Sequence, residues 1–189
     1  MPVSNVIIPP DLSVPDSLAG LPALIQTIES NPPFNRLRPG VHGSTHARRV
    51  LLFSHLIAAS IRGQWGTDPV NERLLTIAAL LHDCGRENDG FDPEHADRSA
   101  ELAVEFCRLR GIECDSELLR NCIRYHCKSE RFVWRNPRIE ARILADADKL
   151  DRFRFHRLAS PLNASRLELG VSHSLIPLAA DVNAHPCGR

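Results

Sequence analysis

Residues Thr76–Asp89 read TIAALLHDCGREND, and this stretch decides the architecture expected for the chain. An apolar helical run ends on adjacent His82 and Asp83, and Gly85 then stops the helix. Imidazole and carboxylate groups are both common metal ligands. Because neighbouring side chains on a helix diverge by about 100°, these two reach one ion only if other helices supply further ligands. The stretch predicts a metal site between helices.

Further ligand types occur on other helices, on both sides of this stretch. His46 lies in residues 42–50, HGSTHARRV, and Asp148 lies in residues 145–151, ADADKLD. Asp148 follows Leu144 by one turn and is therefore expected to face the core. A core carboxylate without a partner is costly, so a metal or another cation is expected beside it.

The helix that carries His46 is predicted to start at Ser44 or Thr45, either of which can cap it, and to run to about Gly63. Its apolar stripe places His46 inward, whereas His55 is predicted to point to solvent. The core face is expected to comprise His46, Val50, Phe53 and Ile57.

A second pair of histidines, His95 and His126, lies between the second and last ligands. Asp92 followed by Pro93 resembles a cap with proline at the first helical position, which places His95 in a first turn. His126 is on the apolar stripe of a helix expected to start at Asp115 or Ser116. Both histidines are thus expected to face inward.

The order His, His-Asp and a distant Asp followed by Lys resembles the HD superfamily of metal-dependent phosphohydrolases, over roughly residues 42–151. Within that superfamily, residues 86–95 and 146–151 look most like small bacterial HD hydrolases. The resemblance implies an all-α HD-domain helical bundle with the metal site between the helices. It also implies a divalent ion bound by His46, His82, Asp83 and Asp148.

The reaction implied by the resemblance is hydrolysis of a phosphate ester or anhydride, in a nucleotide or a similar small phosphorylated metabolite. A bound ion would activate water and polarise the phosphoryl oxygen, and Asp83 would accept the proton. Arg86, in the short loop after the ligand pair, is expected to offset substrate charge. Lys149 matches the lysine that meets phosphate in dNTP triphosphohydrolases, and His42 is a substrate, loop or supporting residue.

The number of ions is open at this stage. Two-metal members of the superfamily make a second ion at His95 and His126 one interpretation, and general acid or oxyanion stabilisation at a one-metal site is the other. Imidazole and carboxylate ligands suit Mn, Fe, Co, Ni, Zn or Mg. Asp146 and Asp151 are expected to cap, pair or support the site, and Cys84 to be buried filler rather than a metal neighbour or redox thiol.

Two further functional classes share this pattern. Some HD proteins are mixed-valent di-iron oxygenases with the same six ligands, and others could be ligand-binding modules without catalysis. The complete ligand set argues against a module without catalysis.

Composition limits the class of protein. With 189 residues and 43% apolar content the chain is long enough for one sizeable core. Lys plus Arg and Asp plus Glu both total 23, which disfavours general nucleic-acid binding. Six cysteines without a CxxC pair, and no apolar run of membrane length, indicate reduced thiols in a cytoplasmic protein with no membrane partner.

The expected organisation has three parts. Residues 1–35 form a Pro-rich arm with one short helix near residues 18–30, residues 36–158 form the HD domain, and residues 159–189 form a tail packed on it. The central helix is predicted over Pro69–Cys84, with Asp68 as its cap. Residues 172–180 are expected to form a short helix.

Overall fold

The computed structural model describes residues 20–30, 41–65, 70–127, 137–155 and 166–184. Over these ranges it contains α-helices, a 3-10 helix and no strand, which confirms the all-α prediction. The helices are α1 (Leu21–Glu29), α2 (Ser44–Trp65), α3 (Glu72–Leu81), α4 (His95–Leu109), α5 (Ser116–His126), α6 (Ile139–Asp151), η3 (Arg152–Phe155), α7 (Gly170–Ser174) and α8 (Ile176–Ala184).

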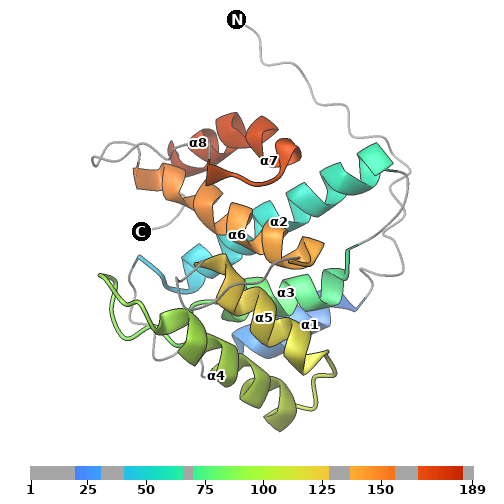
Figure 1. Cartoon of the computed structure of the whole chain (residues 1–189), viewed down its shortest axis with the longest axis vertical. Coiled ribbons are helices and arrows are strands. Elements are labelled where there is room, and N and C mark those ends of the chain that lie inside the picture. The colour runs from blue at the N-terminus through green and yellow to red at the C-terminus, as the bar shows by residue number, and fades with distance from the viewer. Residues whose placement is uncertain (1–19, 31–40, 66–69, 128–136, 156–165, 185–189) are drawn as a thin grey trace, which may run out of the picture.

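Helix α3 is the centre of the bundle (Figure 1). It packs against α1, α2, α4, α5 and α6, and all of its residues except Arg73 are buried. A helix covered on every side must be apolar almost all round, which is why its sequence shows no polar face. Its C-terminal end, where His82 follows, therefore lies inside the protein.

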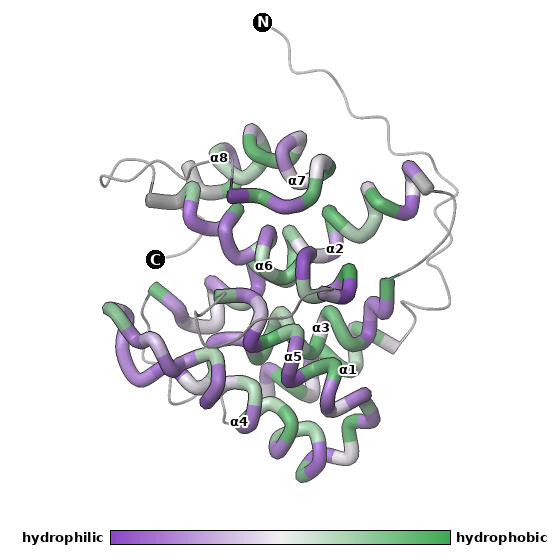
Figure 2. The backbone as a smooth tube through the Cα atoms, viewed as in Figure 1, coloured by the Kyte–Doolittle hydropathy of each residue, from purple (hydrophilic) through white to green (hydrophobic). Residues whose placement is uncertain are grey.

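The surrounding helices pack in pairs, with α6 between α2 and α5, and α4 against α5 (Figure 1). His46, Val50, Phe53 and Ile57 are all buried, as their spacing on α2 predicts. Figure 2 shows hydrophilic and hydrophobic residues alternating along α4 and α5. This pattern is expected of helices with one face against the core.

The central helix is shorter than its predicted span. Asn71 caps it, and its side chain accepts a hydrogen bond from the Leu74 amide at 3.0 Å. The start predicted at Pro69 is therefore wrong, and Pro69 itself lies outside the described residues. The amide oxygen of Asn71 fills the capping role that was predicted for Asp68, three residues further along the chain. The helix also ends at Leu81, three residues before the expected end.

The boundaries of other helices agree with prediction in part. Helix α4 begins at His95 with Glu94 as its N-cap, so the start predicted at Asp92 and Pro93 is wrong. Asp115 caps α5 through the Leu118 amide at 2.9 Å, as expected. The single helix expected over residues 172–180 is instead two, α7 and α8, separated at Leu175. The amide of Leu175 bonds to the carbonyl of Ser172, which closes a tight turn at the end of α7.

His55 does not point to solvent, which corrects the prediction. Its ring is half-buried, with Nδ1 2.6 Å from Glu72 Oε2 and Nε2 3.0 Å from Thr76 Oγ1. Glu72 is buried and also pairs with Arg62. The histidine and the arginine together compensate a carboxylate that would be costly to bury alone. His55 is thus a structural residue between α2 and α3.

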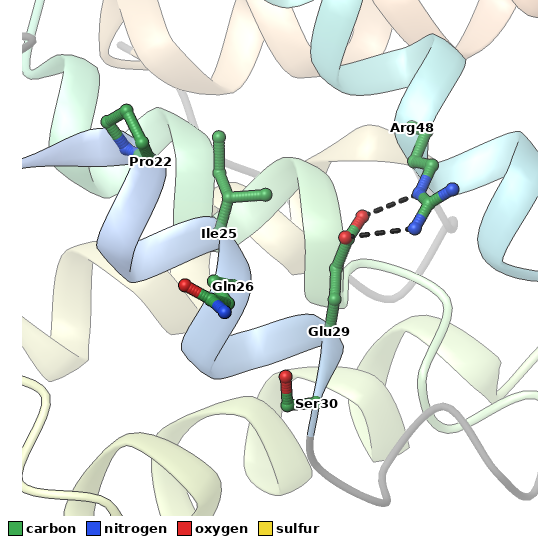
Figure 3. A pocket seen from close by; sticks show the side chains of 6 residues that line it. All are labelled: Pro22, Ile25, Gln26, Glu29, Ser30 and Arg48. Carbon is green, nitrogen blue, oxygen red and sulfur yellow. Dashed lines mark hydrogen bonds and ion pairs between the residues drawn. The ribbon is translucent and has the colours of Figure 1, made fainter.

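Helix α1 is attached to the bundle by apolar contacts and by one surface ion pair. Leu21, Leu24 and Ile28 are buried in the core. Glu29 accepts two hydrogen bonds from Arg48 on α2, at 2.6 and 2.9 Å (Figure 3). Because Arg48 is largely exposed, this pair contributes at most about 1 kcal/mol. Burial of the apolar face is the larger contribution to attachment.

Among the described helices, none combines the length and apolarity needed to cross a membrane.

Gly85 lies where the end of α3 approaches α4, and it gives the first testable prediction. A Cβ at this position would lie 2.7 Å from the Arg98 carbonyl carbon and also against the Ser99 amide. Both are backbone atoms that cannot move aside, so Gly85→Ala should destabilise the fold by about 1–3 kcal/mol. Urea unfolding measures the change. Gly63→Ala, in α2 with nothing within 4 Å, is the control and should not destabilise; equal stability of the two variants would contradict the packing.

Candidate metal centre

Helix ends bring the six predicted ligands together. His46 lies in the first turn of α2, and His95 is the first residue of α4. His126 is the last residue of α5, and His82 and Asp83 follow α3. Five helices thus contribute to one cluster, whose members are His46, His82, Asp83, His95, His126 and Asp148.

The first group surrounds His46 and His82. Their Nε2 atoms are 3.1 Å apart. Asp83 Oδ2 lies 3.4 Å from His46 Nε2 and 3.6 Å from His82 Nε2. Asp148 Oδ1 lies 3.4 and 3.9 Å from the same two nitrogens. The Asp148 side chain is 21% exposed, so this group is open to solvent on the Asp148 side while the other three residues are buried.

The second group surrounds His95 and His126, whose Nε2 atoms are 3.3 Å apart. Asp83 Oδ1 is 3.4 Å from His95 Nε2 and 3.8 Å from His126 Nε2. Asp83 therefore presents one carboxylate oxygen to each group, Oδ2 to the first and Oδ1 to the second. Each group thus has one Asp83 oxygen among the atoms that could bind a metal ion.

The tautomer of each histidine follows from its Nδ1 contact. His82, His95 and His126 donate Nδ1–H to the carbonyls of residues 79, 92 and 123, and a carbonyl can only accept. His46 Nδ1 lies 2.6 Å from Asp151 Oδ2, also an acceptor. In the neutral rings all four Nε2 atoms then carry lone pairs, and these lone pairs converge on one another.

This convergence tests whether divalent ions fit the residues present. Facing lone pairs 3.1 and 3.3 Å apart repel each other unless a metal ion or a shared proton lies between them. Ligands about 2.1 Å from one ion are about 3.0–3.4 Å apart at right or tetrahedral angles. The nitrogen–nitrogen and nitrogen–oxygen distances of the first group span 3.1–3.9 Å. Imidazoles anchored at Nδ1 with Nε2 directed inward are typical of metal ligands, so the residues fit.

The cluster strongly shifts the pKa of its own members. Burial would raise the pKa of Asp83, but His82, His46, His126 and Arg86 outweigh it and hold that pKa well below the usual range. Burial lowers the pKa of His46, yet Asp148, Asp151 and Asp83 outweigh it and raise the pKa to about 11. In the metal-free protein a proton on His46 thus supplies positive charge at the position that fits an ion.

His126 shows the opposite shift, because burial and the nearby His82 lower its pKa to about 4. The unfolded chain binds a proton at His126 below pH 6.5 and the folded chain does not. The free energy of unfolding of the metal-free protein should therefore fall by about 3 kcal/mol between pH 6.5 and pH 4 from this group. The stability due to His46 is lost in a different window, as pH rises from 6.5 toward 11.

Urea unfolding of the metal-free protein at pH 7 and pH 4.5 measures this effect. His126→Gln carries no titrating ring and should lose less stability between the two pH values than the unmodified chain. An equal loss in both proteins would contradict the burial of a neutral His126.

Asp151 supports the site rather than joining it. Besides accepting from His46, its carboxylate accepts from Arg49 at 2.5 Å, and its side chain is buried. A carboxylate behind a metal-binding imidazole fixes the ring orientation and raises its basicity. Asp146, in contrast, binds the backbone amides of residues 168 and 169 and so fastens the C-terminal segment to α6.

Arg86 contacts two residues of the cluster, whereas the Lys149 ammonium group contacts residues outside it. Arg86 Nε donates to Asp83 Oδ1 at 3.0 Å, and one terminal nitrogen lies 3.2 Å from His95 Nε2. Lys149 Nζ donates to the Arg166 carbonyl at 3.0 Å and lies 3.5 and 3.7 Å from Asp146 and Glu168. The ammonium group of Lys149 therefore joins α6 to residues 166–168.

The loop after α3 is held by its own carboxylates. Asp89 Oδ1 lies 3.2 Å from His42 Nδ1, and the His42 ring meets the edge of the His46 ring at 5.5 Å. Asp92 accepts two hydrogen bonds from Arg98, at 2.6 and 2.5 Å, and one from the amide of residue 87. His42 is therefore a neighbour of the first group. Asp92, predicted as a helix cap, instead accepts from Arg98 and from the loop amide, and Arg98 is an organising residue that the sequence did not indicate.

Two of the described cysteines differ in their surroundings: Cys84 is packed in the core, and Cys127 lies beside the second group. Cys84 is buried with its Sγ 3.6 Å from the Ser99 carbonyl, and burial raises its pKa to about 12, as suits an inert thiol. Cys127, the C-cap of α5, lies close to the second group. Its Sγ and one ring nitrogen each of His95 and His126 are all within 4.8 Å of one another. Only its position next to His126 could have indicated this from sequence.

The comparison with protein families agrees with this geometry. The family model described as HD domain matches residues 43–152, more than half of the chain, and the match spans all six clustered residues. The chain therefore belongs to the HD domain family, whose members are typically metal-dependent hydrolases. No curated protein and no solved structure matches the chain significantly.

Proposed function

We propose that this protein is a metal-dependent phosphohydrolase that cleaves a phosphate ester or anhydride in a nucleotide or similar small phosphorylated metabolite. The observation that carries the proposal is the convergence of four imidazole Nε2 atoms on Asp83, which offers one oxygen to each pair. Membership of the HD domain family supports the same class.

The proposed centre holds two divalent ions. His46, His82, Asp83 and Asp148 would hold the first, and His95, His126 and Asp83 the second. When bound, such ions lower the pKa of coordinated water and polarise a phosphoryl oxygen. The bridging geometry of Asp83 favours this arrangement over a single ion with two acid histidines, because both of its oxygens already face imidazole nitrogens.

The protein groups around the ions have separate roles in the proposal. Asp83 holds both ions and stays ionised; its lowered pKa makes it a weak base, so its ligand role outweighs its role as a proton acceptor. Arg86, beside Asp83 and His95, places a fixed positive charge where a phosphoryl group would carry developing charge. Asp148, on the exposed side of the cluster, marks the side from which substrate would enter.

Substrate contacts are proposed for Arg86, His42 and Lys149. His42 lies at the rim between the first group and the loop that holds Asp89. Lys149 reaches a polyphosphate only if its ammonium exchanges its contacts with Asp146 and Glu168 for the substrate. The arginine is therefore the better supported of the two cations.

This difference gives a kinetic prediction. Arg86→Ala should lower kcat by about 10²-fold or more, because it removes charge that acts in the transition state. Lys149→Ala should mainly raise KM for a polyphosphate, as expected for loss of uniform binding. Steady-state kinetics on one cognate substrate measure both, and negligible effects of both substitutions would remove these residues from the site.

The reaction itself is tested by a hydrolysis screen over metals and substrates. Metal-free protein is loaded separately with Mn, Fe, Co, Ni, Zn or Mg and assayed on nucleoside mono-, di- and triphosphates and sugar phosphates, with phosphate and pyrophosphate measured separately. Metal-dependent release of either product is expected. Oxygen uptake by the iron-loaded protein without hydrolysis would instead support the di-iron oxygenase, and metal binding without any turnover would support a ligand-binding module.

A further inference from the structure

We infer that Cys127 is a ligand of the second ion, which would give that site a sulfur donor that the first site lacks. The inference rests on the second ion proposed above, but not on the reaction. Two observations support it: the position of Cys127, and the Nε2 atoms that His95 and His126 direct into the cluster.

Cys127 is placed by the end of α5. It directly follows His126 and forms the C-cap of the helix, where the chain leaves the helical path. Its Sγ lies within 4.8 Å of a ring nitrogen of both His95 and His126. Cys127 is half-buried, whereas the two histidines are buried.

The histidine pair is an incomplete donor set without it. His95 and His126 each use Nδ1 on a backbone carbonyl, so Nε2 is the nitrogen that each could offer to an ion. An ion there would displace the Arg86 terminal nitrogen that lies 3.2 Å from His95 Nε2. Asp83 Oδ1 adds a third donor. Zinc and related ions in proteins commonly bind four ligands, with metal–sulfur distances of about 2.3 Å. Cys127, which is grouped with this histidine pair among the described residues, would supply the fourth donor.

The two sites would then differ in chemistry. The first site has two nitrogens and two carboxylate oxygens, from His46, His82, Asp83 and Asp148. The second would have two nitrogens, one oxygen and one thiolate. Thiolate selects softer ions such as Zn over Mg and Mn, so the second site should prefer Zn or Co, while the first tolerates harder ions.

Cobalt titration tests the assignment without any substrate. Metal-free full-length protein under reducing, anaerobic conditions is titrated with Co²⁺, and absorption is recorded through the near-ultraviolet, where thiolate-to-cobalt charge transfer occurs, and the visible. We expect two cobalt ions per chain and a charge-transfer band that saturates with one of them. Cys127→Ser should lose the band and bind that ion at least about tenfold more weakly, since loss of mere supporting partners already costs 10–100-fold.

Controls separate the outcomes. Cys114→Ser changes a half-buried thiol that lies in neither of the ligand groups found among the described residues, and it should keep the band. A band that persists in Cys127→Ser, or two bound ions with no band in the unmodified protein, would overturn the cysteine ligand and leave the second ion intact. Binding of only one ion per chain would overturn both the second ion and the cysteine ligand, whether or not the protein hydrolyses phosphate.

A second measurement covers the case in which Cys127→Ser does not fold. Alkylation of the unmodified protein with iodoacetamide, followed by peptide mass spectrometry, gives the labelling rate of Cys127 with and without Zn²⁺. A metal-bound thiolate should be labelled at least about tenfold more slowly, because the alkylating agent reacts with a free thiolate and the metal occupies the sulfur lone pair. An unchanged rate at saturating Zn²⁺ would overturn the inference.

Discussion

Asp83→Ala should lose bound divalent ion and catalytic activity together. The carboxylate contributes a donor to each histidine pair, at 3.4 and 3.6 Å on one side and 3.4 and 3.8 Å on the other. Its removal also leaves Arg86 without its buried carboxylate partner. Metal content by elemental analysis after dialysis should fall from two ions per chain to less than one.

His82→Ala is the companion variant, because it removes one donor from the first group and leaves the second group complete. It should lose the first ion and retain the other, with activity lost in parallel. Asp181→Ala, an exposed aspartate on α8, is the control and should keep both metal and activity. Circular dichroism confirms that each variant is folded. Unchanged metal content in folded Asp83→Ala would contradict the assignment of the site.

The second large effect concerns the number of ions. The double variant His95→Ala/His126→Ala should bind one ion instead of two and keep its helical fold, because His46, His82, Asp83 and Asp148 remain. Its activity should fall by about 10²-fold or more, since the second ion no longer stabilises developing charge. Isothermal titration of the metal-free proteins gives the stoichiometry.

Unchanged stoichiometry in the double variant would contradict the second ion. His95 and His126 would then be acid or phosphate-binding groups at a one-metal centre. His55→Ala provides a matched control, because His55 is a partly buried histidine engaged with Glu72 and Thr76 rather than with the cluster. It should bind two ions like the unmodified chain.

Much of the fold can be predicted from the sequence, because its apolar residues recur with one period, that of the α-helix. The apolar stripe of α2 indicated that His46 is buried, and the stripe of α5 did the same for His126. Asp115 was recognisable as a cap from its position before an apolar run. These features depend on local spacing, which sequence records directly.

Features that depend on a distant partner were harder to predict. His55 looked solvent-facing because its burial follows from Glu72, a residue on another helix. Lys149 was assigned to phosphate by resemblance, yet its contacts are with Asp146 and residues 166–168. Tertiary pairing decides such positions, and helical spacing alone carries no information about which helix lies opposite.

In the candidate site, too, contacts between distant residues are what the sequence does not predict. The identity of the six clustered residues followed from their residue types and order, whereas the bridging orientation of Asp83 depends on how five helix ends meet. Cys127 was missed for the same reason, since its nearness to His95 is set by the packing of α4 against α5.

The most direct test of the two-metal centre is a crystal structure of the metal-loaded protein, with anomalous diffraction measured on both sides of the absorption edge of the metal. Two anomalous peaks are expected, one between His46 and His82 and one between His95 and His126, about 3.5–4 Å apart with Asp83 between them. A single peak would contradict the second ion. No peak within reach of Asp83 would contradict the metal centre altogether.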